Sequence, residues 1–203
     1  MKDWFERWIE RIANRLAHST HWEKNSQEYQ SMKYGLDALL RNAIGVLLLM
    51  LAAFALQIPL QCAVFLLIFG FLRSASFGVH ANSIWLCTLL SFVRTLGGVY
   101  LALFLKNHAP VWVLIAMSIL SLTLFWRYAP AETTKRPIPP KQRKRFTEKS
   151  RFYIVLVVIQ VWELQGFGQR EYAFIVAMAM LLQSINLCPV MYRIFEKPRA
   201  YEI

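Results

Sequence analysis

The chain has 203 residues, of which 57% are hydrophobic and only 17% are charged, and this composition is too apolar for an ordinary soluble domain. Lys and Arg outnumber Asp and Glu by 23 to 12, so the net charge is +11, which suits either nucleic acid or an anionic membrane surface. Nine of the 23 basic residues fall between Arg127 and Arg151, in one segment between apolar runs. This placement predicts contact with membrane lipids and no binding of nucleic acid.

Residues 1–35 are predicted to form a cytoplasmic amphipathic segment. Trp4, Trp8 and Ile12 recur at helical spacing with charged residues between them, as in a helix that lies in the plane of the lipid headgroups. A helix packed against the protein's own cytoplasmic loops would show the same pattern, and the sequence does not choose between the two. The early charges also differ from those of a cleavable signal peptide, so we expect this segment to be retained.

Six apolar segments follow, and we interpret each as a membrane-spanning helix. Residues 36–126 contain the first four, and residues 152–189 contain the fifth and sixth. The first two spans form a hairpin that is broken at Gln57-Ile58-Pro59; its first arm begins near Leu36 and its second runs from Pro59 to about Arg73. The other four spans are Ser83 to Leu105, Val111 to Trp126, Phe152 to Phe167 and Tyr172 to Cys188. Six crossings place both termini on one side of the membrane, and we expect that side to be the cytoplasm.

Residues 127–151 form the predicted basic cytoplasmic loop, and residues 190–203 a cytoplasmic tail. Because the loop contains Pro137, Pro139 and Pro140, we expect an extended connector that faces the lipid headgroups. The predicted fold class is therefore all-α. The expectation is a polytopic membrane protein of about six transmembrane helices with an N-terminal amphipathic interfacial helix, built as a single integral membrane domain over residues 1–203.

One semipolar stretch between the second and third predicted spans brings a His and a Cys close together in sequence. Arg73, His80 and Cys87 are spaced seven residues apart, so on one unbroken helix they would lie about 10.5 Å apart, too far for a thiol and its base. A turn at Gly78 could bring His80 within reach of Cys87 and place the thiol just after a helix N-terminus, where the dipole favours a thiolate. Spacing alone favours the alternative, in which Cys87 is a core residue, His80 an interfacial residue and Arg73 a lipid anchor.

The segment Gly78-Val-His80-Ala-Asn-Ser-Ile-Trp-Leu-Cys87 resembles the signature of the accessory gene regulator B family of membrane peptide-processing enzymes. Arg73, the run from Pro130 to Ile138, the chain length and the multi-span layout extend the resemblance over nearly the whole chain. One departure is Phe77, because family members commonly carry two consecutive glycines before the His region.

The resemblance implies a cysteine endopeptidase of the bacterial cell membrane, with Cys87 as the nucleophile and His80 as its base. Arg73 and Gly78 would support the substrate or the structure of the site. The implied substrate is a small precursor peptide of Gram-positive quorum sensing, cut on the way to a cyclic thiolactone or lactone. A peptide exporter or a non-catalytic membrane scaffold is the alternative function, and a homodimer is left open.

Other polar residues of the apolar spans predict structural roles. Arg94 and Glu163 lie inside the third and fifth predicted spans, at depths that favour a structural ion pair over a catalytic role. Four uncharged polar residues of the last two spans are predicted to form hydrogen bonds between helices. They are Gln160, Gln183, Ser184 and Asn186.

The remaining thiols and imidazoles do not form a metal-binding pattern. Cys62 and Cys188 lie in apolar spans and are predicted to be packing residues. His18 and His21 lack a third ligand at suitable spacing. We therefore expect no metal and no cofactor.

Overall fold

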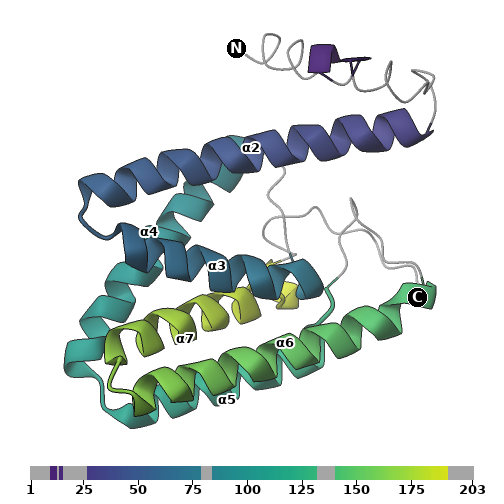
Figure 1. Cartoon of the computed structure of the whole chain (residues 1–203). Coiled ribbons are helices and arrows are strands. Elements are labelled where there is room, and N and C mark those ends of the chain that lie inside the picture. Colours follow the sequence, from purple (N-terminus) through teal and green to yellow (C-terminus); the bar gives the residue numbers. More distant parts are fainter. Residues whose placement is uncertain (1–9, 13, 16–26, 79–83, 132–139, 192–203) are drawn as a thin grey trace. The chain divides into compact units, whose positions relative to one another are not determined.

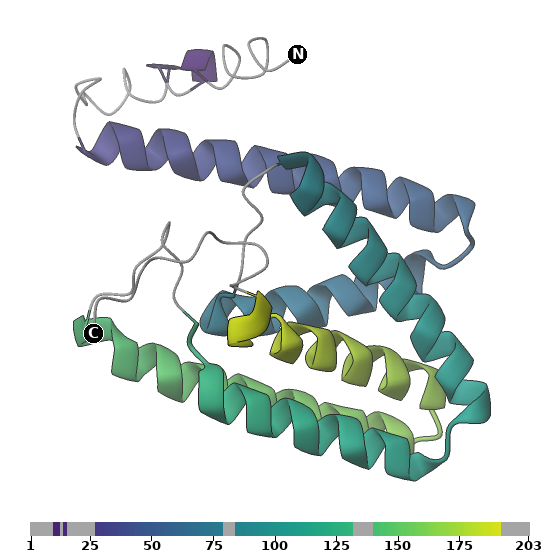
Figure 2. The same ribbon diagram turned by 180° about the vertical axis from the view of Figure 1, so that it is seen from behind.

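The structure is a computed structural model, and it describes residues 10–12, 14–15, 27–78, 84–131 and 140–191. In this part of the chain the secondary structure is helical, apart from one isolated bridge between Phe77 and Ala131. The helices are α2 (Gln27–Ala55), α3 (Pro59–Ser76), α4 (Ile84–His108), α5 (Val111–Tyr128), α6 (Pro140–Gly166) and α7 (Arg170–Ile185), shown in Figure 1 and from behind in Figure 2. The predicted all-α fold class is confirmed.

The chain divides into two compact units, Met1–Ala52 and Ala53–Ile203. The first unit contains most of α2, where the Tyr29 hydroxyl donates a hydrogen bond to Asn14 Oδ1 at 2.8 Å. Farther along α2, the side chains of Leu47 and other large apolar residues are exposed, as expected for a helix surface in contact with lipid. The second unit contains α3 to α7 and every candidate site residue.

Helix α7 forms the centre of the second unit. Residues Ala173 to Met180 are all buried, because α3, α4, α5 and α6 each pack against α7. A helix enclosed on all sides must be apolar on all sides, as this segment is. At Gly98 of α4, an added Cβ would lie 2.8 Å from the Phe65 ring of α3 and 3.0 Å from Leu182 of α7. Glycine at this position therefore permits the close approach of three helices.

Two turns with the same hydrogen-bond pattern end α2 and α6. After α2, Gln57 adopts φ +60°, its N–H donates to the carbonyl of Phe54, and the N–H of Ile58 donates to the carbonyl of Ala53. After α6, Gly168 adopts φ +75° and the corresponding two bonds close the turn. Both turns are Schellman motifs, which satisfy the free carbonyls of a helix end. The first confirms the hairpin break predicted at Gln57.

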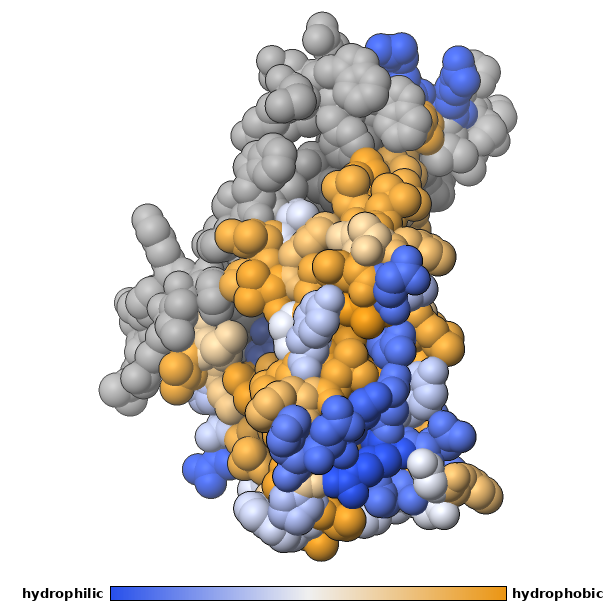
Figure 3. All heavy atoms as spheres, turned by 90° about the vertical axis from the view of Figure 1, so that its left-hand side faces the viewer, coloured by the Kyte–Doolittle hydropathy of each residue, from blue (hydrophilic) through white to orange (hydrophobic). Residues whose placement is uncertain are grey.

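Among the described residues, three helices are long and apolar enough to cross a membrane, over Pro59–Ser76, Thr88–His108 and Val111–Tyr128. These coincide with the second, third and fourth predicted spans. Their outer faces are apolar, since Leu67 is 71% exposed and Trp112 is 65% exposed, which is expected in lipid and unusual in water. The protein is therefore an all-α membrane protein, while crossings by α2, α6 and α7 stay predictions. In Figure 3 hydrophobic residues cover much of the visible face, and hydrophilic residues gather in its lower part.

The basic segment differs from its prediction. Helix α6 begins at Pro140, so residues 140–151 are helical and the prediction of an extended connector up to Arg151 is wrong for them. Proline is disfavoured inside a helix but is well suited to the first helical position, where its missing N–H has no partner to lose. The first turns of α6 expose a row of cations, namely Arg143, Lys144, Arg145 and Lys149.

Candidate functional site

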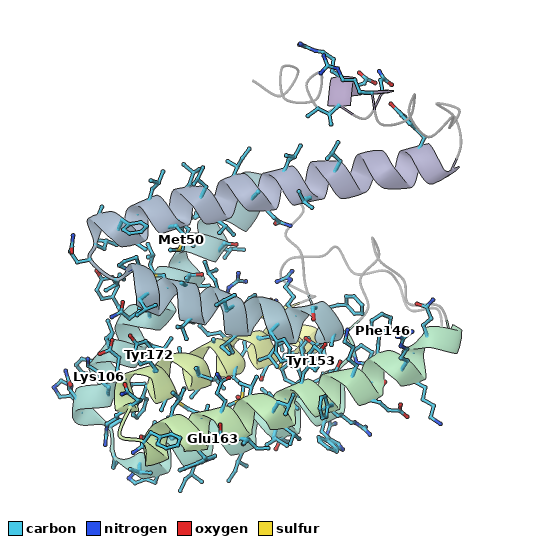
Figure 4. All side chains as sticks on the ribbon, in the orientation of Figure 1. Met50, Lys106, Phe146, Tyr153, Glu163 and Tyr172 are labelled. Carbon is cyan, nitrogen blue, oxygen red and sulfur yellow. The ribbon has the colours of Figure 1, made fainter. Side chains whose placement is uncertain are left out.

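The two ends of the second unit have different chemistry, and Figure 4 labels Lys106 at one end and Phe146 near the other. At the first end, Glu171 forms an ion pair with Lys106 and accepts a 2.8 Å hydrogen bond from Gln61 Nε2. The hydrogen bonds from Lys106 and Gln61 hold the pKa of the Glu171 carboxyl below its ordinary value. Arg170 donates to the backbone carbonyls of Lys106 and Ala109. These contacts tie α7 to α3 and α4, so we assign them a structural role.

The other end contains the exit of the chain from α3, residues 76–78, which we call the α3 exit. Phe77 has φ +60° and ψ −122°, and its N–H donates to the carbonyl of Arg73 at 2.9 Å. A non-glycine residue in this region of backbone space is strained by about 1–3 kcal/mol and persists only where its surroundings hold it. The Phe77 ring contacts the Phe146 ring edge to face, with 5.0 Å between ring centres. The N–H of Ala131 donates to the carbonyl of Ser76 at 3.0 Å.

Helix α7 holds the α3 exit through one buried amide. Gln183 Nε2 donates to Ser76 Oγ at 3.0 Å and to the carbonyl of Phe77 at 2.9 Å. Helix α6 adds a further bond, because Ser150 Oγ donates to the carbonyl of Ala75 at 3.0 Å. The strained turn is therefore bound by side chains from two other helices.

Gly78 is required by both backbone conformation and space. Its φ is +111°, which side chains rarely allow. An added Cβ would also lie 3.2 Å from Asn186 Nδ2 and 3.5 Å from Leu187 Cδ2. Helix α3 therefore ends before Gly78, and the residue before Gly78, Phe77, takes a glycine-like conformation although it is not glycine. A return of the chain from Gly78 toward Cys87 stays a prediction.

The predicted dyad is only partly described. His80 falls in residues 79–83, outside the described residues. The backbone of Cys87 belongs to α4, three residues after the first residue Ile84, and its side chain is not described. Since α3 ends at Ser76 and α4 begins at Ile84, the two residues do not share one unbroken helix. The approach of the His80 imidazole to the Cys87 sulfur stays a prediction.

Arg73 and Arg94 converge on one aromatic ring. The guanidinium carbon of half-buried Arg73 lies 5.9 Å from the centre of the Phe69 ring, and that of Arg94 lies 3.8 Å from the same centre, distances at which cation–π attraction acts. Glu163, the predicted partner of Arg94, is exposed on α6. The predicted ion pair is wrong, because α4 packs on α3 and α7, whereas α6 packs on α3, α5 and α7.

The other thiols lie where packing residues are expected. Cys62 is buried, and Cys188 is half-buried with its sulfur 3.8 Å from the carbonyl of Ser184. No cluster of three His, Cys, Asp or Glu side chains occurs in the described ranges, and His18 and His21 fall outside them.

Sequence reasoning missed Gln183 and Asn186 as site residues and predicted only interhelical hydrogen bonds for them. Gln183 donates hydrogen bonds to the α3 exit, and Asn186 Nδ2 lies 3.2 Å from the position that a Cβ of Gly78 would occupy. The sequence pattern that could have identified them is a pair of amides three residues apart at the end of an apolar span, because this spacing places both on one helix face.

Comparison with protein families gives a match over most of the chain. The family model for accessory gene regulator B matches residues 9–187. The chain belongs to the accessory gene regulator B family. The region that matches this family includes the α3 exit, Cys87 and both α7 amides.

Family relatives match over most of their length. The chain is 26% identical over 196 residues to an AgrB-like protein of Listeria monocytogenes serotype 4a (strain HCC23), covering 95% of this chain and 93% of that protein, and an AgrB-like protein of Listeria welshimeri serovar 6b gives the same values. It is 24% identical over 166 residues to the accessory gene regulator protein B of Staphylococcus aureus (strain Newman), covering 81% of this chain and 84% of that protein. No solved structure matches the chain.

Proposed function

We propose that this member of the accessory gene regulator B family is a cysteine endopeptidase of the bacterial cell membrane that cuts a small precursor peptide. The observation that carries the proposal is the break between α3 and α4, where the chain leaves α3 through Phe77 and Gly78 and α4 begins at Ile84. The break removes the separation of about 10.5 Å that one continuous helix would impose on His80 and Cys87. It also places Cys87 near a helix N-terminus, where the dipole favours the thiolate.

The proposed reaction has two steps. In the first, His80 accepts the thiol proton and the Cys87 sulfur attacks the carbonyl carbon of the scissile peptide bond. The carbon–nitrogen bond breaks, the proton passes from His80 to the leaving amine, and the N-terminal part of the precursor remains on Cys87 as a thioester. In the second, a thiol or hydroxyl of that fragment attacks the thioester carbon, and its proton returns through His80 to the Cys87 sulfur. A thiolactone or lactone leaves and the enzyme is restored.

The surroundings of Cys87 along α4 favour ring closure over hydrolysis. The backbone that follows Cys87 continues into an apolar helix that is long enough to cross a membrane, beginning with exposed Leu89 and half-buried Leu90. A thioester at this boundary would meet little water. An internal nucleophile of the bound precursor would then have the advantage of proximity.

We further propose that the α3 exit faces the cytoplasm and that both termini lie there. The first turns of α6 reach the α3 exit through Ser150 and Phe146, and these turns carry the exposed row of cations. At the opposite end, Lys106 is neutralised by Glu171. Since basic residues accumulate on the cytoplasmic side of membrane proteins, this charge difference supports the orientation.

The test uses the full chain in phospholipid vesicles with a synthetic precursor, taken from a short reading frame beside the gene that encodes an amphipathic peptide with Cys or Ser ahead of an acidic tail. Mass analysis should show a thioester adduct followed by a cyclic product one water lighter than the linear fragment. Cys87→Ala should leave the precursor uncut, whereas Cys62→Ala and Cys188→Ala should still cut it. Equal loss in all three variants would indicate a folding defect and contradict the assignment of the nucleophile.

Two other outcomes would change the proposal. Linear fragments alone, from a precursor whose own nucleophile is intact, would refute acyl transfer and leave simple proteolysis. Passage of uncut peptide across the membrane by Cys87→Ala, at the rate of the unmodified chain, would favour the peptide exporter.

A further inference from the structure

Two amide side chains at the end of α7 are buried and each has a polar atom left over. Gln183 is fully buried and Asn186 is 8% exposed. Among the described residues, Gln183 Oε1 and Asn186 Nδ2 have no hydrogen-bond partner. Buried polar atoms in native proteins are nearly always paired, and an unpaired one calls for an explanation such as a bound ligand.

The chemistry of the two free atoms is defined by the bonds already made. Gln183 turns its NH₂ group toward the carbonyl of Phe77, which can only accept, so the free atom of Gln183 is an acceptor. Asn186 Nδ2 is a donor and lies 3.2 Å from the position that a Cβ of Gly78 would occupy. The end of α7 therefore presents one free acceptor and one free donor beside the α3 exit.

Covalent geometry relates these atoms to the proposed catalytic base. His80 is two residues beyond Gly78, and two trans peptide units span about 7 Å at most. The free donor of Asn186 lies 3.2 Å from the position that a Cβ of Gly78 would occupy, which is two residues before His80 in the sequence. The other elements at this end supply packing and bonds already used, through Phe146, Ser150 and Leu187.

We propose that Gln183 and Asn186 form a subsite that binds the backbone of the precursor peptide at the residue whose carbonyl is attacked. This proposal rests on the proposed endopeptidase function. In an extended peptide the N–H and C=O of one residue point to the same side, as in a hydrogen-bonded pair of a β-ladder. Asn186 Nδ2 donates to that carbonyl oxygen, and Gln183 Oε1 accepts from that N–H.

Asn186 and Gln183 have different roles in the proposed reaction. As the Cys87 sulfur attacks, negative charge develops on the carbonyl oxygen, and a donor already held in place stabilises the transition state more than the substrate. Asn186 is therefore a catalytic residue, and removal of its donor should reduce the rate of thioester formation about 100-fold. Gln183 is in addition a positioning residue for the α3 exit.

The experiment measures thioester formation by the full chain in phospholipid vesicles with the synthetic precursor, in a background of Cys62→Ser and Cys188→Ser. Asn186→Asp keeps the volume of the side chain and Asn186→Leu keeps its branched shape. Both remove the donor, and both should lose about 100-fold in the rate. Asn107→Asp, at an exposed amide in the last turn of α4, is the matched control and should keep the rate within about twofold.

A second readout separates substrate binding from a structural role. Alkylation of Cys87 by iodoacetamide, measured against pH, reports the thiolate without any peptide. The proposal expects the same alkylation profile for Asn186→Leu as for the unchanged residue. A shifted or abolished profile would mean that Asn186 acts on the dyad itself, and would overturn the substrate subsite.

The peptide side of the contact is tested with a precursor methylated on the N–H of the residue before the cleaved bond. In the parent protein the methylated peptide should react about 10-fold more slowly than the unmethylated peptide. In Gln183→Leu the two peptides should react at the same rate. Equal losses in both proteins would refute the Gln183 contact.

Two outcomes separate the subsite from the proposed function. If Cys87→Ala still cuts the precursor, the proposed function itself fails. If cutting depends on Cys87 but both Asn186 variants react within threefold of the parent, only the subsite is refuted.

Discussion

Gly78→Ala is the sharpest test of the α3 exit. An alanine at φ +111° is strained by about 1–3 kcal/mol, and its Cβ would approach Asn186 Nδ2 to 3.2 Å, which requires a small shift that adds about 1 kcal/mol. We expect the free energy of unfolding to fall by about 2–4 kcal/mol. The measurement is unfolding in mixed micelles by titration with a denaturing detergent, followed by tryptophan fluorescence.

Two other glycines supply matched controls. Gly70 lies exposed on α3, and an added Cβ meets nothing within 4 Å, so Gly70→Ala should stabilise the helix by about 0.5–1 kcal/mol. Gly98→Ala should destabilise the protein, because its Cβ would meet Phe65 at 2.8 Å. If Gly78→Ala unfolds within about 0.5 kcal/mol of the unchanged protein while Gly98→Ala is destabilised, the conformation argued for Gly78 is wrong.

Three further predictions follow from the same contacts. Phe77→Gly should be less destabilising than Phe77→Ala by about 1 kcal/mol in the same titration, because both lose the ring contact with Phe146 but only glycine relieves the positive φ; equal losses would contradict the strain at Phe77. The lowered pKa of Glu171 means that its stabilising contribution is complete above its ordinary value near 4.5 and is lost as the pH falls through the lowered pKa. Unfolding measured from pH 7 to pH 3 should therefore show a smaller loss for Glu171→Gln than for the parent. In a chain without other cysteines, a cysteine at His108 or Gln169 should react with an impermeant reagent added outside cells, and one at position 140 should not; external labelling at position 140 would refute the six-span orientation.

Local chemistry allowed much of the fold to be predicted. The helical class, the break at Gln57 and the starts of α3 and α5 follow from apolar run lengths and from Pro59 and Pro110, which act through their own backbone. The error at α6 had a local cause, because Pro140 was counted with the preceding prolines as part of an extended loop although it also fits a first helical position.

The site was harder to predict, because its parts are distant in sequence. The positive φ of Phe77 is unfavourable for any side chain and depends on Phe146, Ala131 and Gln183, which belong to three other segments. Likewise, Arg94 and Glu163 matched in apparent depth, but depth does not say which helices are neighbours.

The sequence alone determined that the chain is an α-helical membrane protein, where most of its helices break, and which His and Cys are the candidates for chemistry, because run length, proline position and residue type are local properties. Only the tertiary structure decided that α7 is enclosed by four helices and that Gln183 and Asn186 face the α3 exit. The physical reason is that burial and hydrogen-bond partners are set by contacts between helices, and an isolated amide in an apolar span carries no mark of which backbone it will meet.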